Sequence, residues 1–267
     1  MDSDAVKRKV IDYYDQEAGK YADIYKVSPL DQEFYPANSV RLDIIVDVLR
    51  GRKAKSLLDV GFGSGYPLAR FLKLGFDAHG FDFSPKLVES AKGLLKQEGC
   101  DSSRGTEGDL EKRSTLPNRT FDAIVATGVF AHNLHEAAAF ANLRGLLGSN
   151  GVALVEFRNS LMSLFSINRY FAPFFWDELL KGDLLPEPLR EEARAFLSAK
   201  FTTEVQSVGQ KRSIEFTYIL ARYHNPLTLG VLAASYGMKL DKTNITISMP
   251  HHRIQRRPTS DSSGRNR

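Results

Sequence analysis

One carboxylate and three glycines stand at a spacing that suits ligand binding: Asp59, Gly61, Gly63 and Gly65. Segment 57–66, which contains them, begins with apolar residues and predicts a short buried strand, a glycine-rich turn and the start of a helix. Glycine lets the backbone approach a ligand closely because it has no Cβ. The N–H groups and positive dipole end at the start of a helix attract an anion. We therefore expect this turn to hold a nucleotide-like cofactor.

Two further carboxylates follow predicted strands of the same sheet. Asp82 ends the second predicted strand, where it can accept hydrogen bonds from both ribose hydroxyls of a nucleotide. The alternative is a turn or helix-capping role, although Ser84 is the better cap. Asp109 follows the third predicted strand and can accept from the exocyclic amine of an adenine, with Leu110 and Phe83 against the faces of the base. The alternative for Asp109 is a solvated loop residue.

The spacing of the glycines distinguishes between kinds of nucleotide site. A dinucleotide fold has the pattern G-x-G-x-x-G, whereas Tyr66 stands at its last position here. An acidic residue two positions before G-x-G-x-G instead resembles motif I of the class I S-adenosylmethionine-dependent methyltransferases. The resemblance covers roughly residues 10–158. The motifs that carry it are LLDVGFGSG (57–65), GFDFSP (80–85), GDL (108–110), FDAIVA (121–126) and LLGSNG (146–151).

Two upstream segments resemble the small-molecule branch of that superfamily. YDQEAGKY (14–21) is similar to its Tyr-Asp-x-x-Ala-x-x-Tyr lead-in, and NSVRL (38–42) is similar to a segment of the ubiquinone-pathway O-methyltransferases. In that segment the Arg meets the cofactor carboxylate, which implies this role for Arg41, although an exposed helix face would also accommodate an Arg. Tyr21 is expected near the cofactor and the substrate, as part of an N-terminal helix that forms a lid over the site.

The resemblance implies S-adenosylmethionine as cofactor and methyl transfer to the oxygen or nitrogen of a small molecule. Asp59 would hold the ammonium of the methionine moiety through water, and Thr127 would line the sulfur end. The cofactor-binding residues that we expect are Arg41, Asp59, Gly61, Gly63, Gly65, Asp82, Phe83, Asp109, Leu110 and Thr127.

Catalysis of methyl transfer depends on aligning the acceptor with the reacting bond and on excluding water. A hydroxyl acceptor also gains from a general base. His132, just past the fourth predicted strand, is the candidate base, although a His in such a turn often caps or packs locally. His224 is a candidate substrate contact if the segment around it folds over the site. No metal site is expected.

The alternation of apolar patterns predicts an α/β, Rossmann-like, mostly parallel sheet of the seven-stranded type with helices on both faces. Predicted strands are 56–60, 77–82, 106–108, 121–126, 152–157, 213–221 and 238–248. Predicted helices include 4–25, 39–49, 65–74, 134–147, 227–236 and one that begins at Pro188.

We expect the chain to divide into five parts: a helical lid (1–50), the cofactor-binding core (51–158), an insertion that caps the acceptor side (159–226), the end of the core (227–250) and a basic tail (251–267). The insertion carries an aromatic-rich helical stretch at 161–176. That stretch is either its buried face or the lining of an acceptor pocket.

Composition excludes several classes of protein. The chain of 267 residues has a single cysteine, Cys100, which excludes an intrachain disulfide and a cysteine-based zinc site. No apolar run approaches the roughly 20 residues of a membrane span, and residues 1–4 lack the basic-then-apolar start of a signal. The expected location is therefore cytoplasmic.

The net charge of +4 is concentrated at one end of the chain. Residues 251–267 hold five Arg and one Asp, so the remainder is close to neutral, and the tail has too few apolar residues to order itself. This distribution disfavours nucleic acid as a partner. An RNA methyltransferase, a nicotinamide-dependent oxidoreductase and a module that binds the cofactor without catalysis remain the alternatives.

Overall fold

The computed structural model describes residues 3–23, 37–161, 186–201 and 222–243. Within them, five parallel strands form one sheet in the order β3-β2-β1-β4-β5. The strands are β1 (Ser56–Val60), β2 (Asp77–Asp82), β3 (Gly105–Glu107), β4 (Phe121–Ala126) and β5 (Leu147–Val155). The strand order reverses between β1 and β4, because the chain runs outward from β1 to β3 and returns on the other side. Open parallel sheets bind ligands at the carboxyl ends of the strands beside such a reversal.

The strands carry apolar side chains on both faces. In β4, Ala123 and Val125 belong to one buried cluster, whereas Ile124 and Ala126 belong to another. Leu57 of β1 lies opposite Ala123 and joins the first cluster. Strands buried on both sides are typical of a parallel sheet between two layers of helices.

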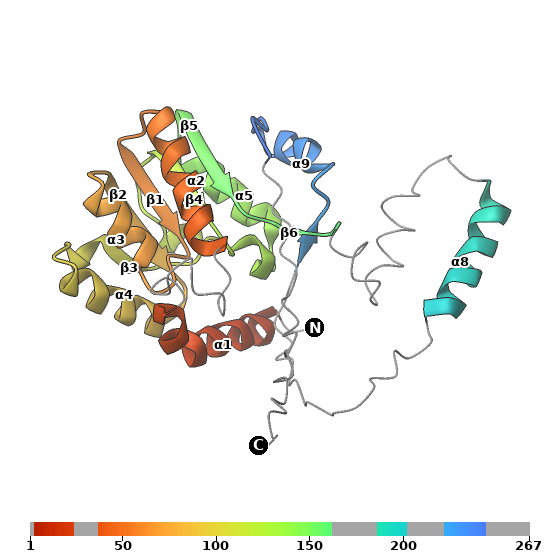
Figure 1. Cartoon of the computed structure of the whole chain (residues 1–267), viewed down its shortest axis with the longest axis horizontal. Helices are drawn as coiled ribbons and strands as arrows, with labels where there is room; N and C mark the ends of the chain where they lie inside the picture. The colour runs from red at the N-terminus through yellow and green to blue at the C-terminus, as the bar shows by residue number, and fades with distance from the viewer. Residues whose placement is uncertain (1–2, 24–36, 162–185, 202–221, 244–267) are drawn as a thin grey trace, which may run out of the picture.

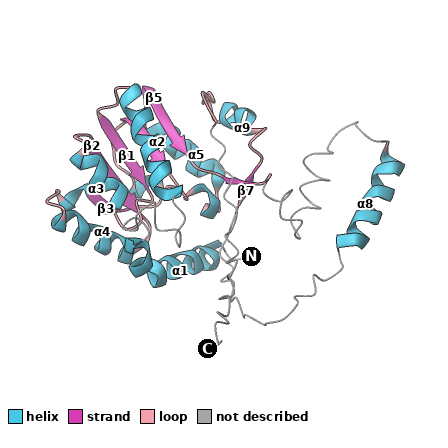
Figure 2. Cartoon of the chain, viewed as in Figure 1, coloured by secondary structure: helices cyan, strands magenta, loops and turns pink. Residues whose placement is uncertain are grey.

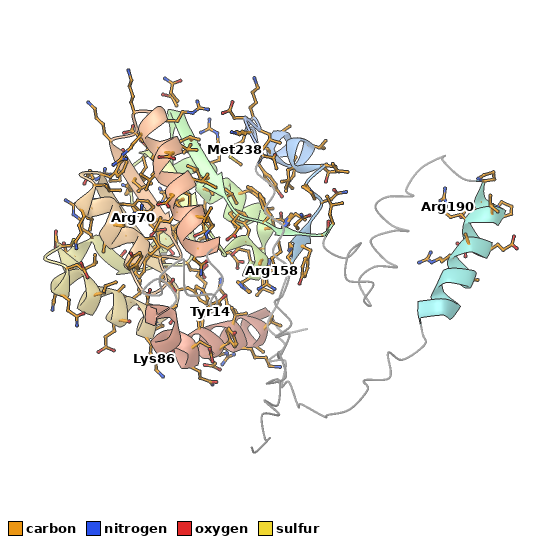
Figure 3. All side chains as sticks on the ribbon, viewed as in Figure 1. Tyr14, Arg70, Lys86, Arg158, Arg190 and Met238 are labelled. Carbon is orange, nitrogen blue, oxygen red and sulfur yellow. The ribbon has the colours of Figure 1, made fainter. Side chains whose placement is uncertain are left out.

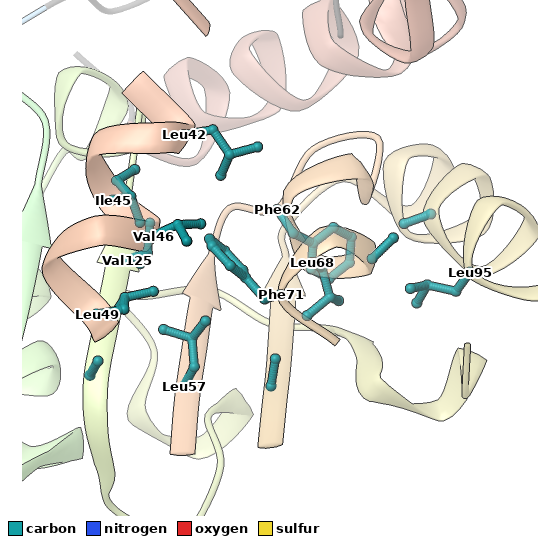
Figure 4. Packing of buried hydrophobic residues seen from close by; sticks show 14 of the residues in the cluster. Leu42, Ile45, Val46, Leu49, Leu57, Phe62, Leu68, Phe71, Leu95 and Val125 are labelled. Atoms are coloured by element: carbon teal, nitrogen blue, oxygen red, sulfur yellow. The ribbon is translucent and has the colours of Figure 1, made fainter. Parts of the chain in front are cut away.

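Helices cover both faces of the sheet (Figure 2). The first face carries α2 (Ala37–Gly51), α3 (Tyr66–Lys73) and α4 (Pro85–Gln97), and the second carries α5 (Glu136–Leu146), with α9 (Leu229–Ser235) contributing Leu232. Figure 4 shows the first cluster, in which an apolar stripe of α2 packs near Leu57 and Phe71. The stripe recurs at the spacing of one helix face and consists of Leu42, Ile45, Val46 and Leu49.

Helix α1 (Ser3–Asp23) runs across the carboxyl ends of the strands (Figure 1). The Asp15 carboxylate fixes it to the start of α4, because it accepts hydrogen bonds from the Ser84 hydroxyl and, at 3.4 Å, from the Lys86 N–H. Tyr14 and Lys86 are labelled on these adjoining elements in Figure 3. The remaining elements are η1 (Ser102–Arg104), η2 (Arg113–Thr115), η3 (Phe130–His132), α8 (Glu187–Phe201), and the short paired strands β6 (Arg158–Asn159) and β7 (Tyr223–His224).

The structure confirms the Rossmann-like α/β class, and strands 56–60, 77–82 and 121–126 have the predicted bounds. β5 begins at Leu147 rather than at 152, because the turn-like residues after Leu147 are absorbed as an irregularity in its register with β4. The strand predicted from 238 does not form over 238–243, where Met238 instead packs against the second buried cluster. Strand 213–221 and most of the aromatic stretch lie outside the described residues.

Candidate functional site

The carboxyl ends of β1, β2 and β4 open into a cavity of about 280 Å³ that α1 and α2 help to enclose. It brings together residues from six separate parts of the sequence. The predicted residues that line it are Arg41, Asp59, Gly61, Gly63, Asp82, Phe83, Asp109, Leu110, Thr127 and His132. Lining residues that the sequence did not single out for ligand binding include Lys7, Ser64, Glu111 and Asn133.

The glycine loop forms the floor of the cavity. A Cβ on Gly61 would lie 2.5 Å from Cγ2 of Val129, so this position requires glycine for close packing. Gly63 has a φ of +58°, and a Cβ there would meet no protein atom within 4 Å. Gly65 does not line the cavity. It precedes α3 with a φ of +83°, and its added Cβ would lie 2.7 Å from Cβ of Ala91, so it permits α3 and α4 to approach closely.

Asp82 is buried at the end of β2 and ties that strand to the glycine loop. Its Oδ2 accepts a hydrogen bond from the Gly63 N–H and its Oδ1 from the Ser84 N–H, each at 3.0 Å. Burial raises the pKa of Asp82 to about 6, although the Ser84 and Gly63 N–H groups act in the opposite direction. Each carboxylate oxygen can accept more than one hydrogen bond, so Asp82 retains the capacity to accept from ribose hydroxyls.

Asp59 is the most electrostatically unusual residue of the site. It is only 2% exposed, and among the described residues its Oδ2 has no hydrogen-bond partner. Burial, reinforced by the charge of Asp82, raises the pKa of Asp59 to about 8, while Arg41 acts to lower it. A cationic group in the cavity would favour the ionised carboxylate, which is the property expected of a residue that holds an ammonium.

Asp109 already has a cationic partner. Its Oδ2 lies 2.5 Å from Nζ of Lys7 on α1, and its Oδ1 accepts a hydrogen bond from the Glu111 N–H at 2.9 Å. Leu110 is buried beside it, and Phe83 lines the same cavity. The carboxylate predicted to meet an adenine amine is therefore also an anchor for α1.

Tyr14 and His132 meet across the cavity. The Tyr14 hydroxyl lies 2.7 Å from Nε2 of His132, and the tautomer of the imidazole decides which of the two donates. Their rings are in edge contact with centroids 5.4 Å apart, and the Tyr14 ring is also in edge contact with Phe83. The contact between Tyr14 and His132 joins α1 to the loop after β4, and it positions the candidate base.

Arg41 lines the cavity from α2 and forms an ion pair at its rim. Its Nη1 donates to both carboxylate oxygens of Glu156, at 2.9 and 2.8 Å. Glu156 follows β5, and its N–H extends the sheet by bonding to the carbonyl of Ala126 at 3.0 Å. Thr127, which follows β4, lines the cavity as predicted. The role of Arg41 toward a cofactor carboxylate stays a prediction.

His224 does not line this cavity. Its Nε2 bonds to Glu136 at 2.8 Å, and its ring lies 4.5 Å from that of Phe157. Arg222 shares Glu136 and bonds through its N–H to the carbonyl of Ala131 at 2.8 Å, so this cluster supports the loop after β4 from outside. A substrate contact by His224 stays a prediction. The Tyr21 side chain lies outside the described residues.

Besides Asp59, two lining residues carry buried polar atoms that lack partners in the described part of the chain, Ser64 through Oγ and Asn133 through Nδ2. Ser64 lies inside the glycine motif, so its position could have been inferred from the sequence. Asn133 and Lys7 gave no such signal, because their place in the site depends on how a loop and a helix dock.

Two features are absent from the described residues. Within the residues that the structure describes, no group of His, Cys, Asp and Glu side chains is arranged to hold a metal ion. None of the helices in those same ranges has the length and apolar character needed to cross a bilayer.

Known proteins resemble this chain chiefly over its sheet. A family model described as a methyltransferase domain matches residues 57–151. A ubiquinone biosynthesis O-methyltransferase of Histophilus somni is 28% identical over 148 residues, which are 54% of this chain and 62% of that protein. A glycine/sarcosine N-methyltransferase of Parasynechococcus marenigrum is 29% identical over 122 residues, 44% of this chain and 43% of that protein. The chain spans about half the length of the curated relatives it matches.

A solved structure supports the fold over a longer range. The magnesium protoporphyrin IX methyltransferase of Synechocystis PCC 6803, with bound SAH, has a TM-score of 0.58, 16% sequence identity, and coverage of 90% of this chain and 92% of that one. At this identity the likeness concerns the fold. With the sheet order, the motifs and the domain match, it identifies the class of fold: the chain has, over residues 57–151, a stretch similar to a methyltransferase domain, and it has the Rossmann-like fold that its resemblance to the class I S-adenosylmethionine-dependent methyltransferases predicted.

The residues of the cavity fit the cofactor of that class. S-adenosylmethionine is polar at its amino-acid and ribose ends, and the cavity holds unpartnered buried atoms of Asp59, Ser64 and Asn133 within the described residues. Asp82 keeps acceptor capacity, and the open space over Gly63 would be filled by any side chain. Asp59, Asp82, Asp109 and the glycine loop are the groups that would hold it.

Proposed function

We propose that this protein transfers a methyl group from S-adenosylmethionine to an oxygen or nitrogen of a small molecule. When bound, the cofactor supplies a methyl on a sulfonium and a neutral thioether as leaving group. The observation that carries the proposal is one cavity with buried Asp59 and Asp82 on its sheet side and the Tyr14–His132 contact on its lid side. Groups suited to hold the cofactor (Asp59 and Asp82) and groups suited to contact the acceptor (Tyr14 and His132) thus line the same cavity.

In this proposal the chain aligns the reactants and manages one proton. α1 covers the carboxyl edge of the sheet and limits access of water, which strengthens electrostatic interactions inside. His132, held by the Tyr14 hydroxyl, takes the proton that a hydroxyl or ammonium acceptor must lose. For a hydroxyl acceptor this assistance is worth about 10²–10⁴-fold in rate.

The small-molecule class is supported by several features. The likeness at 14–21 and 38–42, the near-neutral charge outside the tail and two small-molecule methyltransferases among the relatives all favour it. The printed names of those relatives cover both O- and N-methylation, so both stay within the proposal.

Two measurements test the proposed function. Calorimetry should detect S-adenosylhomocysteine binding, and absence of heat at about 1 mM ligand would contradict a cofactor site. Labelled methyl from S-adenosylmethionine, incubated with enzyme and a cell extract, should then appear in the small-molecule fraction. Label that appeared only in RNA would favour the RNA methyltransferase alternative. Binding with no label in any fraction would favour a module that binds the cofactor without catalysis.

A further inference from the structure

Glu111 is a buried carboxylate whose contacts the proposed chemistry does not explain. Its side chain is 6% exposed. Its Oε1 accepts hydrogen bonds from the backbone N–H groups of Leu134 at 2.6 Å and His135 at 3.2 Å. Its Oε2 lies 2.9 Å from Nζ of Lys7. Because a buried charge is costly unless it is paired, these contacts hold Glu111 in place, and Glu111 in turn holds two segments that are distant in sequence.

The first segment is the lid helix. Lys7 and Tyr14 are seven residues apart, which is two helical turns or about 10 Å along the axis, and both line the cavity together with Val10. The i, i+3, i+7 spacing places the three residues on one face of α1. Lys7 contacts Glu111 and Tyr14 contacts His132, so both ends of this face attach to groups beside the loop after β4.

The second segment is that loop itself. Leu134 and His135 lie two and three positions after His132, and no side chain at His135 caps the start of α5. Glu111 satisfies the two N–H groups there, and its negative charge is favourable near the positive end of the helix. The position of His132 is therefore set from one side by Tyr14 and from the other by the Glu111 carboxylate.

Lys7 connects this arrangement to the cofactor. It also pairs with Asp109 Oδ2, one oxygen of the carboxylate that, under the proposed function, meets the adenine amine. If the adenine amine also donated to that oxygen, it would compete with Lys7 for Asp109. The contact between Lys7 and Glu111 would have no such competitor from the adenine. Occupancy of the adenine end would therefore move the Lys7 ammonium toward Glu111.

We propose that Glu111 is a positioning residue that, with Lys7, couples occupancy of the adenine end of the cavity to the placement of His132 and the closure of α1. The proposal rests on the proposed function only for the identity of the ligand at Asp109. The mechanical link from α1 through Glu111 to the loop at 130–135 is a property of the chain without ligand.

The test uses the full chain with Lys7→Met, Glu111→Gln, the double variant and the matched control Lys9→Met, which removes a charge from an exposed position on the same helix. Hydrogen exchange is followed in residues 3–18 and 130–135, with and without S-adenosylhomocysteine. The ring signals of His132, assigned with a His132→Asn variant, are followed by NMR.

We expect Lys7→Met and Glu111→Gln each to raise exchange in both segments about threefold or more, with the double variant no faster than either single one. The His132 ring signals should shift in the same variants and stay unchanged in Lys9→Met. A purely structural role for Glu111 would lower stability without moving those signals. If Glu111→Gln does not fold, Lys7→Met still removes the ion pair.

Two results would overturn the coupling. One is a loop at 130–135 that keeps its wild-type exchange in Lys7→Met. The other is a double variant whose effect equals the product of the single effects, because independent contacts act additively in free energy. If the wild-type chain binds no S-adenosylhomocysteine, the proposed function fails. Hydrogen exchange of the variants without ligand still tests the link from α1 through Glu111 to residues 130–135.

Discussion

The raised pKa of Asp59 predicts that cofactor binding depends steeply on pH. With a pKa of about 8 in the unliganded protein, the carboxyl is about 1% ionised at pH 6 and about 25% ionised at pH 7.5. If the ligand ammonium binds only the carboxylate, S-adenosylhomocysteine affinity should rise about 25-fold over this interval, or roughly 2 kcal/mol. The ionisation of Asp82, with a pKa of about 6, adds only about a further twofold rise in this affinity near pH 6.

Calorimetry between pH 6 and 7.5 measures this slope, and titrations in two buffers of different ionisation enthalpy count the protons. At pH 7 about 0.9 proton should leave per ligand bound, because Asp59 is then about nine-tenths protonated. Asp59→Asn is the matched control, since the amide resembles the protonated acid in shape. Its affinity should be no higher than that of the wild type at pH 6 and should lack the Asp59 slope. A wild-type affinity constant within twofold across the interval, or the same slope in the Asn variant, would refute the reasoning.

The ionisation of Asp59 also determines whether the free energy of unfolding rises or falls with pH. Between the ordinary pKa of 3.8 in the unfolded chain and about 8 in the folded one, the folded state binds the proton that the unfolded state releases. Stability of the unliganded protein should therefore fall as pH rises through this window, by up to about 1.4 kcal/mol per pH unit from this group, and no further above pH 8. Asp59→Asn should remove that contribution in urea unfolding at pH 8.

Four substitutions extend these tests. Gly65→Ala should lower the free energy of unfolding by about 2–3 kcal/mol, from left-handed strain and contact with Ala91, and an unchanged urea midpoint would refute the close-packing role. Gly63→Ala should cost only about 1 kcal/mol of stability while weakening S-adenosylhomocysteine, which calorimetry measures; unchanged affinity would remove Gly63 from the cofactor floor. Asp82→Asn should weaken the same ligand by about 1–3 kcal/mol, and equal affinity would exclude the ribose role. His132→Asn should lower turnover of a hydroxyl acceptor by about 10²–10⁴-fold with cofactor affinity within twofold, and full activity would exclude His132 as base.

Much of the core could be predicted because its signals are local. The glycine spacing requires a tight turn, and the apolar runs at 56–60 and 121–126 fit only strands buried on both sides. Asp59 is the penultimate residue of the first strand, Asp82 ends the strand 77–82, and Thr127 directly follows 121–126. The carboxyl ends of parallel strands meet at one edge. The cofactor side of the cavity therefore followed from the order of motifs along the chain.

The bounds of β5 and of α5 were less predictable. Ser149, Asn150 and Gly151 look like a turn in sequence, but pairing with β4 absorbs them into the strand. The N–H groups of Leu134 and His135 bond to Glu111 rather than starting α5. In both cases a partner distant in sequence overrides the local preference.

The sequence by itself determined the fold class, the cofactor loop and the carboxylates at the strand ends, because periodicity and turn chemistry act over a few residues. Only the tertiary structure decided that Gly65 separates two helices, that His224 belongs to the cluster with Glu136, and that Lys7 reaches Asp109 and Glu111. It also decided the raised pKa of Asp59, since burial depends on every element packed around the carboxyl. Contacts and desolvation of this kind join residues that are distant in sequence, such as Lys7 and Glu111 at 104 positions apart, and no local pattern encodes them.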